Sequence, residues 1–279
     1  MDFKIETLTP VNIGNGEILS QFSDYIYENG YVYYLDHSSI IEAIIRKPKG
    51  SNLLDKFISV VKSQAKSNIR NRYNLKEFLK EIGIDFTEHI YRKIPVSDEI
   101  SEQIQLQIKT GREPYIPGST LKGAIKTALL ASLIPDNHDL NVRNINKLKI
   151  DHEYFGQYDK DVLKYLHVSD TLPFREDSLN IAKFYRYNIE SKRTDIPVVK
   201  EVIPELRSST FTLKTTAKPG MLNNEKFEFL LTGQEDTLFE AINQYAELNI
   251  KYELNIWQKE KTDVGKEMAG FYSNLLQET

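Results

Sequence analysis

The chain has 279 residues, a net charge of −4, 27% charged and 40% hydrophobic residues, as ordinary globular proteins do. It contains no cysteine, which excludes disulfides, thiolate metal sites and a cysteine nucleophile and fits a reducing compartment. No apolar run approaches the length of a membrane span, and the N-terminus lacks the pattern of a signal peptide. We therefore expect a cytoplasmic protein that has no membrane partner.

Charge is distributed unevenly along the chain. Residues 46–72 contain eight basic residues and one acid, whereas residues 221–279 contain five lysines and eleven acids. An asymmetry of this size indicates one surface for a polyanion and another for a different partner. Two solvated helix faces would produce the same pattern, so charge alone leaves both interpretations open.

The first 36 residues predict strands. Apolar and polar residues alternate over 2–7, and the apolar runs 25–27 and 31–35 flank Glu28-Asn29-Gly30, a hairpin turn signal. Between these strands lies Gly14-Asn15-Gly16. Two glycines around an asparagine can form a tight turn or let a ligand approach the backbone, and a turn is the simpler interpretation.

Residues 38–82 predict a helical insertion between strands. Ser38 or Ser39 is expected to cap a helix over 40–46, and helical patterns follow over 52–70 and 75–82. Alternating segments at 90–96 and 104–108 then predict that strands resume.

Residues 114–133 form the most distinctive stretch of the chain. Two prolines fix an extended approach, Gly118 ends it, and Ser119 or Thr120 is expected to cap a helix whose apolar residues recur every three or four positions. Lys122 and Lys126 lie four apart on another face. A helix start with free N–H groups and nearby lysines is suited to a phosphate, although the order of a Walker loop is absent.

The second half of the chain continues to mix strands and helices. A polar loop is expected over 135–150, and a short helix at 162–166 running into a strand at 167–170. Two strands, 179–187 and 198–203, flank an exposed connection at 188–197, and 211–214 is expected to pair with 227–231. Residues 237–279 predict a C-terminal helical region. The order indicates an α+β fold without regular βαβ units.

The sequence shows no catalytic or metal-binding constellation. The five histidines are scattered without metal-ligand spacing, and we expect structural roles for His152 beside Glu153 and for His167 near Asp170. A nucleophile elbow is also missing. We therefore expect no cofactor, no metal and no enzymatic activity, while metal-independent RNA cleavage by a histidine with a lysine or tyrosine stays compatible with the spacing.

Two groups of cations indicate a nucleic-acid partner. The first group, near the central stretch, is Lys109, Arg112, Lys122 and Lys126; the second, around the later connection, is Lys183, Arg186, Lys192, Arg193 and Lys200. Tyr185 and Tyr187 lie within the second group. Their rings would allow stacking on bases beside phosphate contacts, but alternating tyrosines in strands more often pack against the protein.

The run Pro114-Tyr-Ile-Pro-Gly-Ser-Thr-Leu-Lys-Gly-Ala-Ile-Lys-Thr-Ala-Leu resembles the signature of the RAMP superfamily, the RNA-binding subunits of type III CRISPR effector complexes. Three further segments resemble the fifth-subunit family of type III-A (Csm) complexes: Leu8-Thr-Pro-Val-Asn-Ile-Gly-Asn-Gly, Val168-Ser-Asp-Thr-Leu-Pro-Phe, and Ile196-Pro-Val-Val-Lys-Glu-Val-Ile-Pro running into Phe211-Thr-Leu. The resemblance covers most of residues 1–215, and the C-terminal helices match loosely.

The resemblance implies one RAMP domain over residues 1–279, with a ferredoxin-like (RRM-related) sheet, the helical insertion at 38–82, a protruding β-hairpin at 188–197 and a C-terminal helical region. It implies a non-catalytic subunit that caps the 3′ region of the guide RNA and contributes to its maturation in antiviral defence. Implied partners are the guide RNA, the adjacent backbone RAMP subunit, the small helical subunit and a recruited host nuclease. The implied RNA-binding residues are Gly14, Asn15, Gly16, Arg112, Gly118, Ser119, Thr120, Lys122, Lys126, Arg186, Lys192 and Arg193.

Two enzymatic alternatives accompany this interpretation. One is a RAMP endoribonuclease that processes precursor guide RNA, and the other is a backbone subunit that cleaves target RNA. The superfamily's target-cleaving subunits use an aspartate on a loop upstream of the central motif, where this chain has Glu102-Gln-Ile-Gln-Leu-Gln-Ile-Lys. No aspartate here therefore takes over that role, and the glycine-rich C-terminal loop of many relatives is missing as well.

Overall fold

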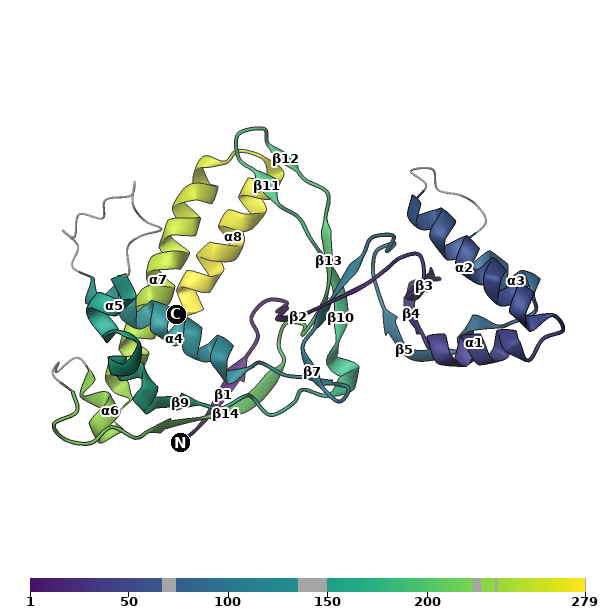
Figure 1. Ribbon diagram of the computed structural model, residues 1–279. Coiled ribbons are helices and arrows are strands. Elements are labelled where there is room, and N and C mark those ends of the chain that lie inside the picture. Colours follow the sequence, from purple (N-terminus) through teal and green to yellow (C-terminus); the bar gives the residue numbers. More distant parts are fainter. Residues whose placement is uncertain (67–73, 135–149, 223–226, 234, 279) are drawn as a thin grey trace.

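The computed structural model describes residues 1–66, 74–134, 150–222, 227–233 and 235–278 (Figure 1). Strands and helices are mixed along the described chain, so the predicted α+β class is confirmed. A central sheet separates two parts of the molecule. In the view of Figure 1, α4, α7 and α8 stand to its left, and a smaller helical unit with its own strands lies to its right.

The central sheet has four strands in the order β10 (Asn180–Phe184), β13 (Val198–Val202), β6 (Ile104–Gln107) and β2 (Gly14–Leu19). β13 and β6 run parallel, and the two outer pairs are antiparallel. The predicted strands at 179–187 and 198–203 thus exist and pair with each other. One face of the sheet packs into a hydrophobic core against the strands on its right, because alternate residues of each strand share a face.

Those strands are β3 (Tyr25–Glu28), β4 (Tyr31–Leu35) and β5 (Ile90–Pro95). The predicted β3–β4 hairpin is confirmed, and Asn29 and Gly30 both have positive φ (51° and 77°), as a type I′ turn requires. A second core joins these strands to α1 (His37–Ile45), α2 (Gly50–Lys66) and α3 (Leu75–Glu81). Residues 67–70 of the predicted second helix lie outside the described chain.

The cap of α1 differs from the prediction. Asp36, not Ser38 or Ser39, is the N-cap residue, and its carboxylate accepts from the backbone N–H of Ser39 at 3.1 Å. Both serines lie inside the first turn. The prediction was wrong because a carboxylate two or three residues earlier satisfies the same free N–H groups and also favours the positive end of the helix dipole.

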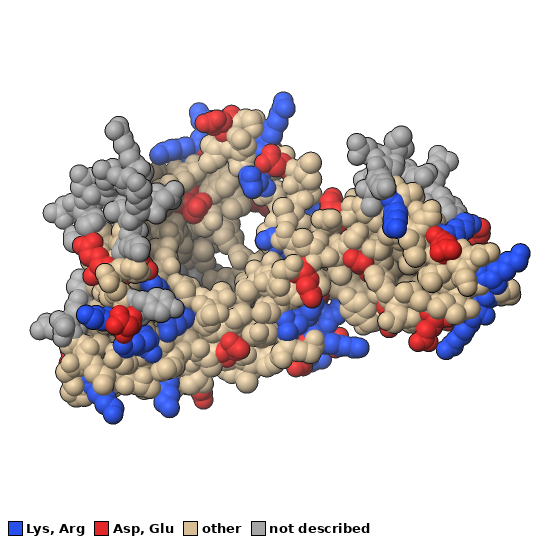
Figure 2. Space-filling model, in the orientation of Figure 1, with Lys and Arg blue, Asp and Glu red and all other residues tan. Residues whose placement is uncertain are grey.

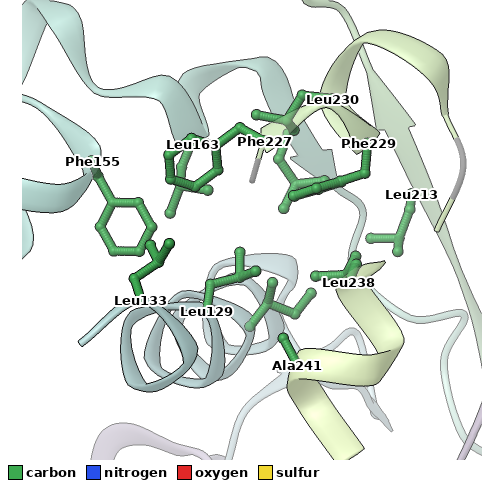
Figure 3. Packing of buried hydrophobic residues seen from close by; sticks show 12 residues of the cluster. Leu129, Leu133, Phe155, Leu163, Leu213, Phe227, Phe229, Leu230, Leu238 and Ala241 are labelled. Carbon is green, nitrogen blue, oxygen red and sulfur yellow. The ribbon is translucent and has the colours of Figure 1, made fainter. Parts of the chain in front are cut away.

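The left part of the molecule joins β1 (Asp2–Glu6), β14 (Ser208–Thr215) and β9 (Leu166–Val168) to α4 (Gly118–Leu133), α7 (Asp236–Lys259) and α8 (Asp263–Glu278). Figure 3 shows the core between them, with Leu129 and Leu133 of α4 facing Phe227, Leu230 and residues of α7. The predicted apolar face of α4 and the predicted C-terminal helical region are both confirmed, the latter as two helices.

The predicted strand over 227–231 is wrong. Residues 229–232 form the short helix α6 (Phe229–Thr232), which ends at Gly233 with a left-handed φ of 68°. Phe227, Phe229 and Leu230 are all buried in the same core. A short apolar run suits a strand or a helix, and here Glu228 and Thr232 face solvent while the aromatic residues and Leu230 enter the core. Residues 211–214 pair instead within β14, which lies between β1 and β9.

Short elements complete the chain. They are β7 (Lys109–Thr110), β8 (Glu113–Pro114), β11 (Tyr187–Asn188), β12 (Arg193–Thr194), α5 (Ile150–Phe155) and the 3₁₀ turns Phe86–Glu88, Tyr158–Lys160, Val162–Tyr165 and Glu176–Ser178. The turn at 162–165 runs into β9, as predicted. Residues 135–149 of the predicted polar loop lie outside the described chain. Among the helices described, none is long and apolar enough to cross a membrane.

Candidate nucleic-acid interface

The start of α4 is fixed by a close backbone contact. Pro117 is the N-cap residue without a side-chain cap, so the prediction that Ser119 or Thr120 caps this helix is wrong. Gly118 is buried, and a Cβ there would lie 2.2 Å from the carbonyl oxygen of Val168. Its backbone N–H donates to the Asp170 carboxylate at 2.7 Å. An internal carboxylate therefore occupies part of the anion-binding helix start, which sequence alone did not reveal.

Ser119 and Thr120 occupy the first turn of α4, and both are exposed. Their hydroxyls are free from the capping role that we expected for one of them. A surface hydroxyl at a helix start, next to N–H groups of the first turn, is a suitable donor to a phosphate oxygen. These two positions fit the predicted RNA contact better than Gly118, which lies underneath them.

The two lysines of α4 are engaged inside the molecule. Lys122 donates from Nζ to the carbonyl of Leu166 at 2.8 Å, and Lys126 forms an ion pair with Asp151 at 3.0 Å. The hydrogen bond from Lys126 lowers the pKa of the Asp151 carboxyl. Both lysine side chains are half-buried. In the free chain, the two lysines therefore brace α4 against β9 and α5. RNA contact by either ammonium group would have to replace one of these existing bonds.

Gly14, Asn15 and Gly16 form the irregular start of β2 at the sheet edge, rather than an isolated turn. Gly16 has a φ of 87°, and Asn15 accepts a hydrogen bond from the backbone N–H of Glu17, so the extra residues bulge out of the ladder. All three are exposed. The preceding residue Ile13 and Leu121 of α4 both pack against the same small core, which brings this edge near the central motif.

Arg112 is exposed at the β7–β8 turn, above a buried charge cluster that sequence reasoning missed. The Glu201 side chain is 0% exposed and accepts from Arg92, Lys109 and the backbone N–H of Gln107. Arg92 also donates to the Arg112 carbonyl at 2.9 Å. The cluster therefore ties β5, β6, β7 and β13 together and holds the turn that carries Arg112. The available signal was a charged residue inside the apolar run of β13.

The predicted hairpin exists as β11–β12, and its tip docks on the α7–α8 turn (Figure 1). Lys192 Nζ pairs with both carboxylate oxygens of Glu260 at 2.7 and 3.0 Å, and the Tyr187 ring lies 5.6 Å from the ring of Trp257. We call these four residues the clasp. The hydrogen bond from Lys192 to Glu260 raises the pKa of the lysine and lowers the pKa of the glutamate. Below the clasp, Figure 2 shows the surface open between the hairpin arm and the helices.

Arg186 and Arg193 remain exposed on the hairpin and its approach. Tyr187, in contrast, is occupied by Trp257 and by a hydrogen bond between its hydroxyl and Thr262. The stacking interpretation is therefore open for Tyr185, whereas Tyr187 packs against the protein. The two arginines are the hairpin cations best placed for phosphates.

The described residues contain no group of three or more histidine, aspartate or glutamate side chains that could hold a metal ion. His167 contacts Thr216 Oγ1 at 3.0 Å and His89 contacts Ser39 Oγ at 2.6 Å. Asp170, the predicted neighbour of His167, binds the start of α4 instead. These contacts are structural.

The model of the RAMP superfamily matches residues 4–270 of the chain. Two proteins named CRISPR system Cms protein Csm5 are similar to it: the one from Methanocaldococcus jannaschii is 28% identical over 216 residues, and the one from Streptococcus thermophilus is 27% identical over 231 residues. The alignments cover 72% and 75% of this chain but 49% and 62% of those proteins. The chain thus spans from about half to just under two thirds of the length of these relatives.

Two solved structures share the fold. The crystal structure of T. onnurineus Csm5 matches with a TM-score of 0.69 at 20% identity, covering 98% of this chain and 86% of that one. A chain in the cryo-EM structure of a Csm–crRNA–target RNA ternary complex matches with a TM-score of 0.70 at 22% identity, covering 98% and 80%. At these identities the matches concern the fold, and they bear out the RAMP-type architecture predicted from the sequence.

Proposed function

The chain belongs to the RAMP superfamily, and from that premise we propose that it is a non-catalytic RNA-binding subunit of a type III-A CRISPR effector complex. The similarity to two Csm5 proteins over about three quarters of the chain carries this proposal. In the proposed role it caps the 3′ region of the guide RNA and contributes to guide maturation in the cytoplasm. Its neighbours would be a backbone RAMP subunit and the small helical subunit, with a recruited host nuclease trimming the RNA.

The described surface supports a backbone-binding mode. Ser119 and Thr120 are exposed at a helix start, Arg112 is exposed at the β7–β8 turn, and Arg186 and Arg193 are exposed just before β11 and in β12. Contacts of this kind hold phosphates and fix register without reading bases. A subunit that must accept every guide sequence requires this mode, because base-specific contacts would restrict the guides that the complex can carry.

No observation favours a processing activity over this role. A metal-independent ribonuclease needs a base within reach of the RNA hydroxyl. In the described chain, His37, His89 and His167 are each hydrogen-bonded to another residue of the protein.

The test is a complex reconstituted with R186A/R193A. Loss of two phosphate contacts should weaken guide-RNA retention. It should also reduce the slope of log K for RNA binding against log salt concentration by about 0.7 for each contact. The matched control is K251A/K266A, which removes two cations that pair within their own helices. Equal RNA retention and an unchanged RNA length profile for both variants would contradict the proposal.

A further inference from the structure

A groove of about 480 Å³ runs along the outer end of the β10–β13 arm. Its lining combines Phe184, Tyr185, Ile196 and Val198 with the cations Arg186 and Lys200 and the acid Asp195. We call it the arm groove. It has the size of a small-molecule site and is bounded by residues that face solvent in the free chain.

Strand register shows which face of the sheet carries the groove. Phe184 pairs with Val198, and Ala182 with Lys200, so these side chains share one face. Their neighbour Val199 points the other way into the core between the two sheets. The groove therefore lies on the face opposite that core, the face that looks toward α7 and α8 across the opening in Figure 2.

Exposed apolar residues are concentrated in this groove. Ile196 is 85% exposed, Tyr185 56%, Val198 43% and Phe184 36%. Burial of aromatic rings is energetically favourable. A chain that leaves two rings exposed beside two aliphatic side chains therefore has a surface suited to binding. The Lys200 ammonium lies 5.4 Å from the centre of the Phe184 ring, which places a mobile cation directly beside an aromatic face.

An aromatic face with flanking cations on an open sheet matches single-stranded RNA. The base stacks on a ring and the phosphates on either side meet lysine or arginine. A peptide partner would fit the aliphatic residues. Unless the peptide carried acidic side chains of its own, however, it would leave the two cations of the groove with only one acid to neutralise them. We propose that the arm groove is a stacking subsite for an unpaired nucleotide of single-stranded RNA, with Phe184 and Tyr185 as base platforms and Arg186 and Lys200 as phosphate contacts.

This inference rests on the proposed RNA-binding function and adds to it a place where bases, not only phosphates, are held. Stacking accepts every base because each has a π-face. The subsite therefore keeps the sequence tolerance that a guide-RNA subunit needs. It also predicts that RNA affinity has a component that salt does not weaken.

The experiment measures binding of the purified full chain to a fluorescein-labelled 20-nucleotide oligo(U) RNA, with inorganic polyphosphate as a competitor that has charge but no bases. F184A should weaken RNA binding about 5-fold or more, and it should leave both the salt slope and the dissociation constant of polyphosphate obtained from the competition unchanged. F184W should bind like the wild type. K200A should instead reduce the salt slope by about 0.7.

Two further variants separate stacking on the ring from a purely apolar contact. F184L keeps the apolar bulk without the ring, so it should lose RNA affinity as F184A does. Y252A removes an aromatic ring that is 64% exposed on α7 and should bind RNA normally. Thermal melting checks that each variant is folded, which we expect because the Phe184 side chain is partly in water.

The outcomes divide cleanly. Wild-type affinity in F184A and F184L would overturn the subsite while leaving the proposed function in place. Loss in F184A with full affinity in F184L would show a purely apolar contact, of the kind a protein partner makes, and would also overturn stacking. Absence of RNA binding by the wild-type chain would contradict the proposed function, and the subsite would fall with it.

Discussion

Gly118→Ala should destabilise the chain although the change adds only one methyl group. The new Cβ would lie 2.2 Å from the Val168 carbonyl oxygen and 2.7 Å from the carbonyl carbon and oxygen of Ser169. These are backbone atoms, so the start of α4 must move away from the segment after β9. Overpacking of this kind costs about 1–3 kcal/mol, and stretching the hydrogen bond to the Asp170 carboxylate adds about 1.5–3 kcal/mol. We expect a total loss of about 2.5–6 kcal/mol.

Gly123→Ala is the matched control, because it makes the same chemical change in the same helix. A Cβ at Gly123 meets nothing within 4 Å, and alanine is the better helix former by about 0.5–1 kcal/mol. Urea unfolding of the two variants should therefore move the midpoint in opposite directions without a large change in slope. Equal midpoints for wild type and Gly118→Ala, or equal losses in both variants, would refute the packing argument.

Two other predictions concern pairs that hold the parts of the molecule together. Glu201→Gln should lower the free energy of unfolding by about 3 kcal/mol, measured by the same urea titration, because it removes the buried carboxylate that pairs with Lys109 and Arg92 and leaves Arg92, only 7% exposed, with Glu176 as its remaining acidic partner; an unchanged midpoint would count against this. The clasp should open in acid. Pairing with Lys192 lowers the pKa of Glu260 from its ordinary value of 4.5, so the ion pair stabilises the folded chain above pH 4.5 and loses this contribution as the pH falls below that value. Trp257 is the only tryptophan and lies against Tyr187, so its fluorescence should change in that range, and Glu260→Gln should abolish the transition; an identical transition in that variant would exclude Glu260 as its cause.

Local patterns predicted the elements whose packing is regular. Sequence patterns predicted β6, β10 and β13 of the central sheet but not β2, whose first residues were expected to form a turn or to let a ligand approach. Glu28-Asn29-Gly30 identified a hairpin because positive φ at its last two residues suits asparagine and glycine. The pattern was wrong at Phe229–Thr232, because a short apolar run between the exposed residues Glu228 and Thr232 fits a strand and a helix equally well. It was also wrong about both helix caps, since several neighbouring residues can satisfy the same N–H groups.

Local sequence patterns could not predict the long-range hydrogen-bond and ion-pair partners at the candidate interface. Asp170 binds Gly118 across 52 residues, and Lys192 binds Glu260 across 68 residues. In the sequence, Lys192 therefore counted as a free cation of an exposed hairpin. Periodicity shows which face of an element is buried, but it carries no information on which distant side chain neutralises a charge. That information comes from the tertiary arrangement alone.

The central motif acquires a different meaning from these contacts. Its most constrained residue, Gly118, is selected by the close approach of the β9 backbone, and the lysines that follow brace α4 from inside. A match to this motif is therefore a strong indicator of the RAMP fold and a weak indicator of RNA contact. The proposed RNA contact depends on exposed residues of the motif, such as Ser119, and on the arm, where Arg186 and Phe184 face solvent. Substitutions that separate fold from RNA binding should accordingly be made at those exposed positions, because changes at the buried residues of the motif alter both together.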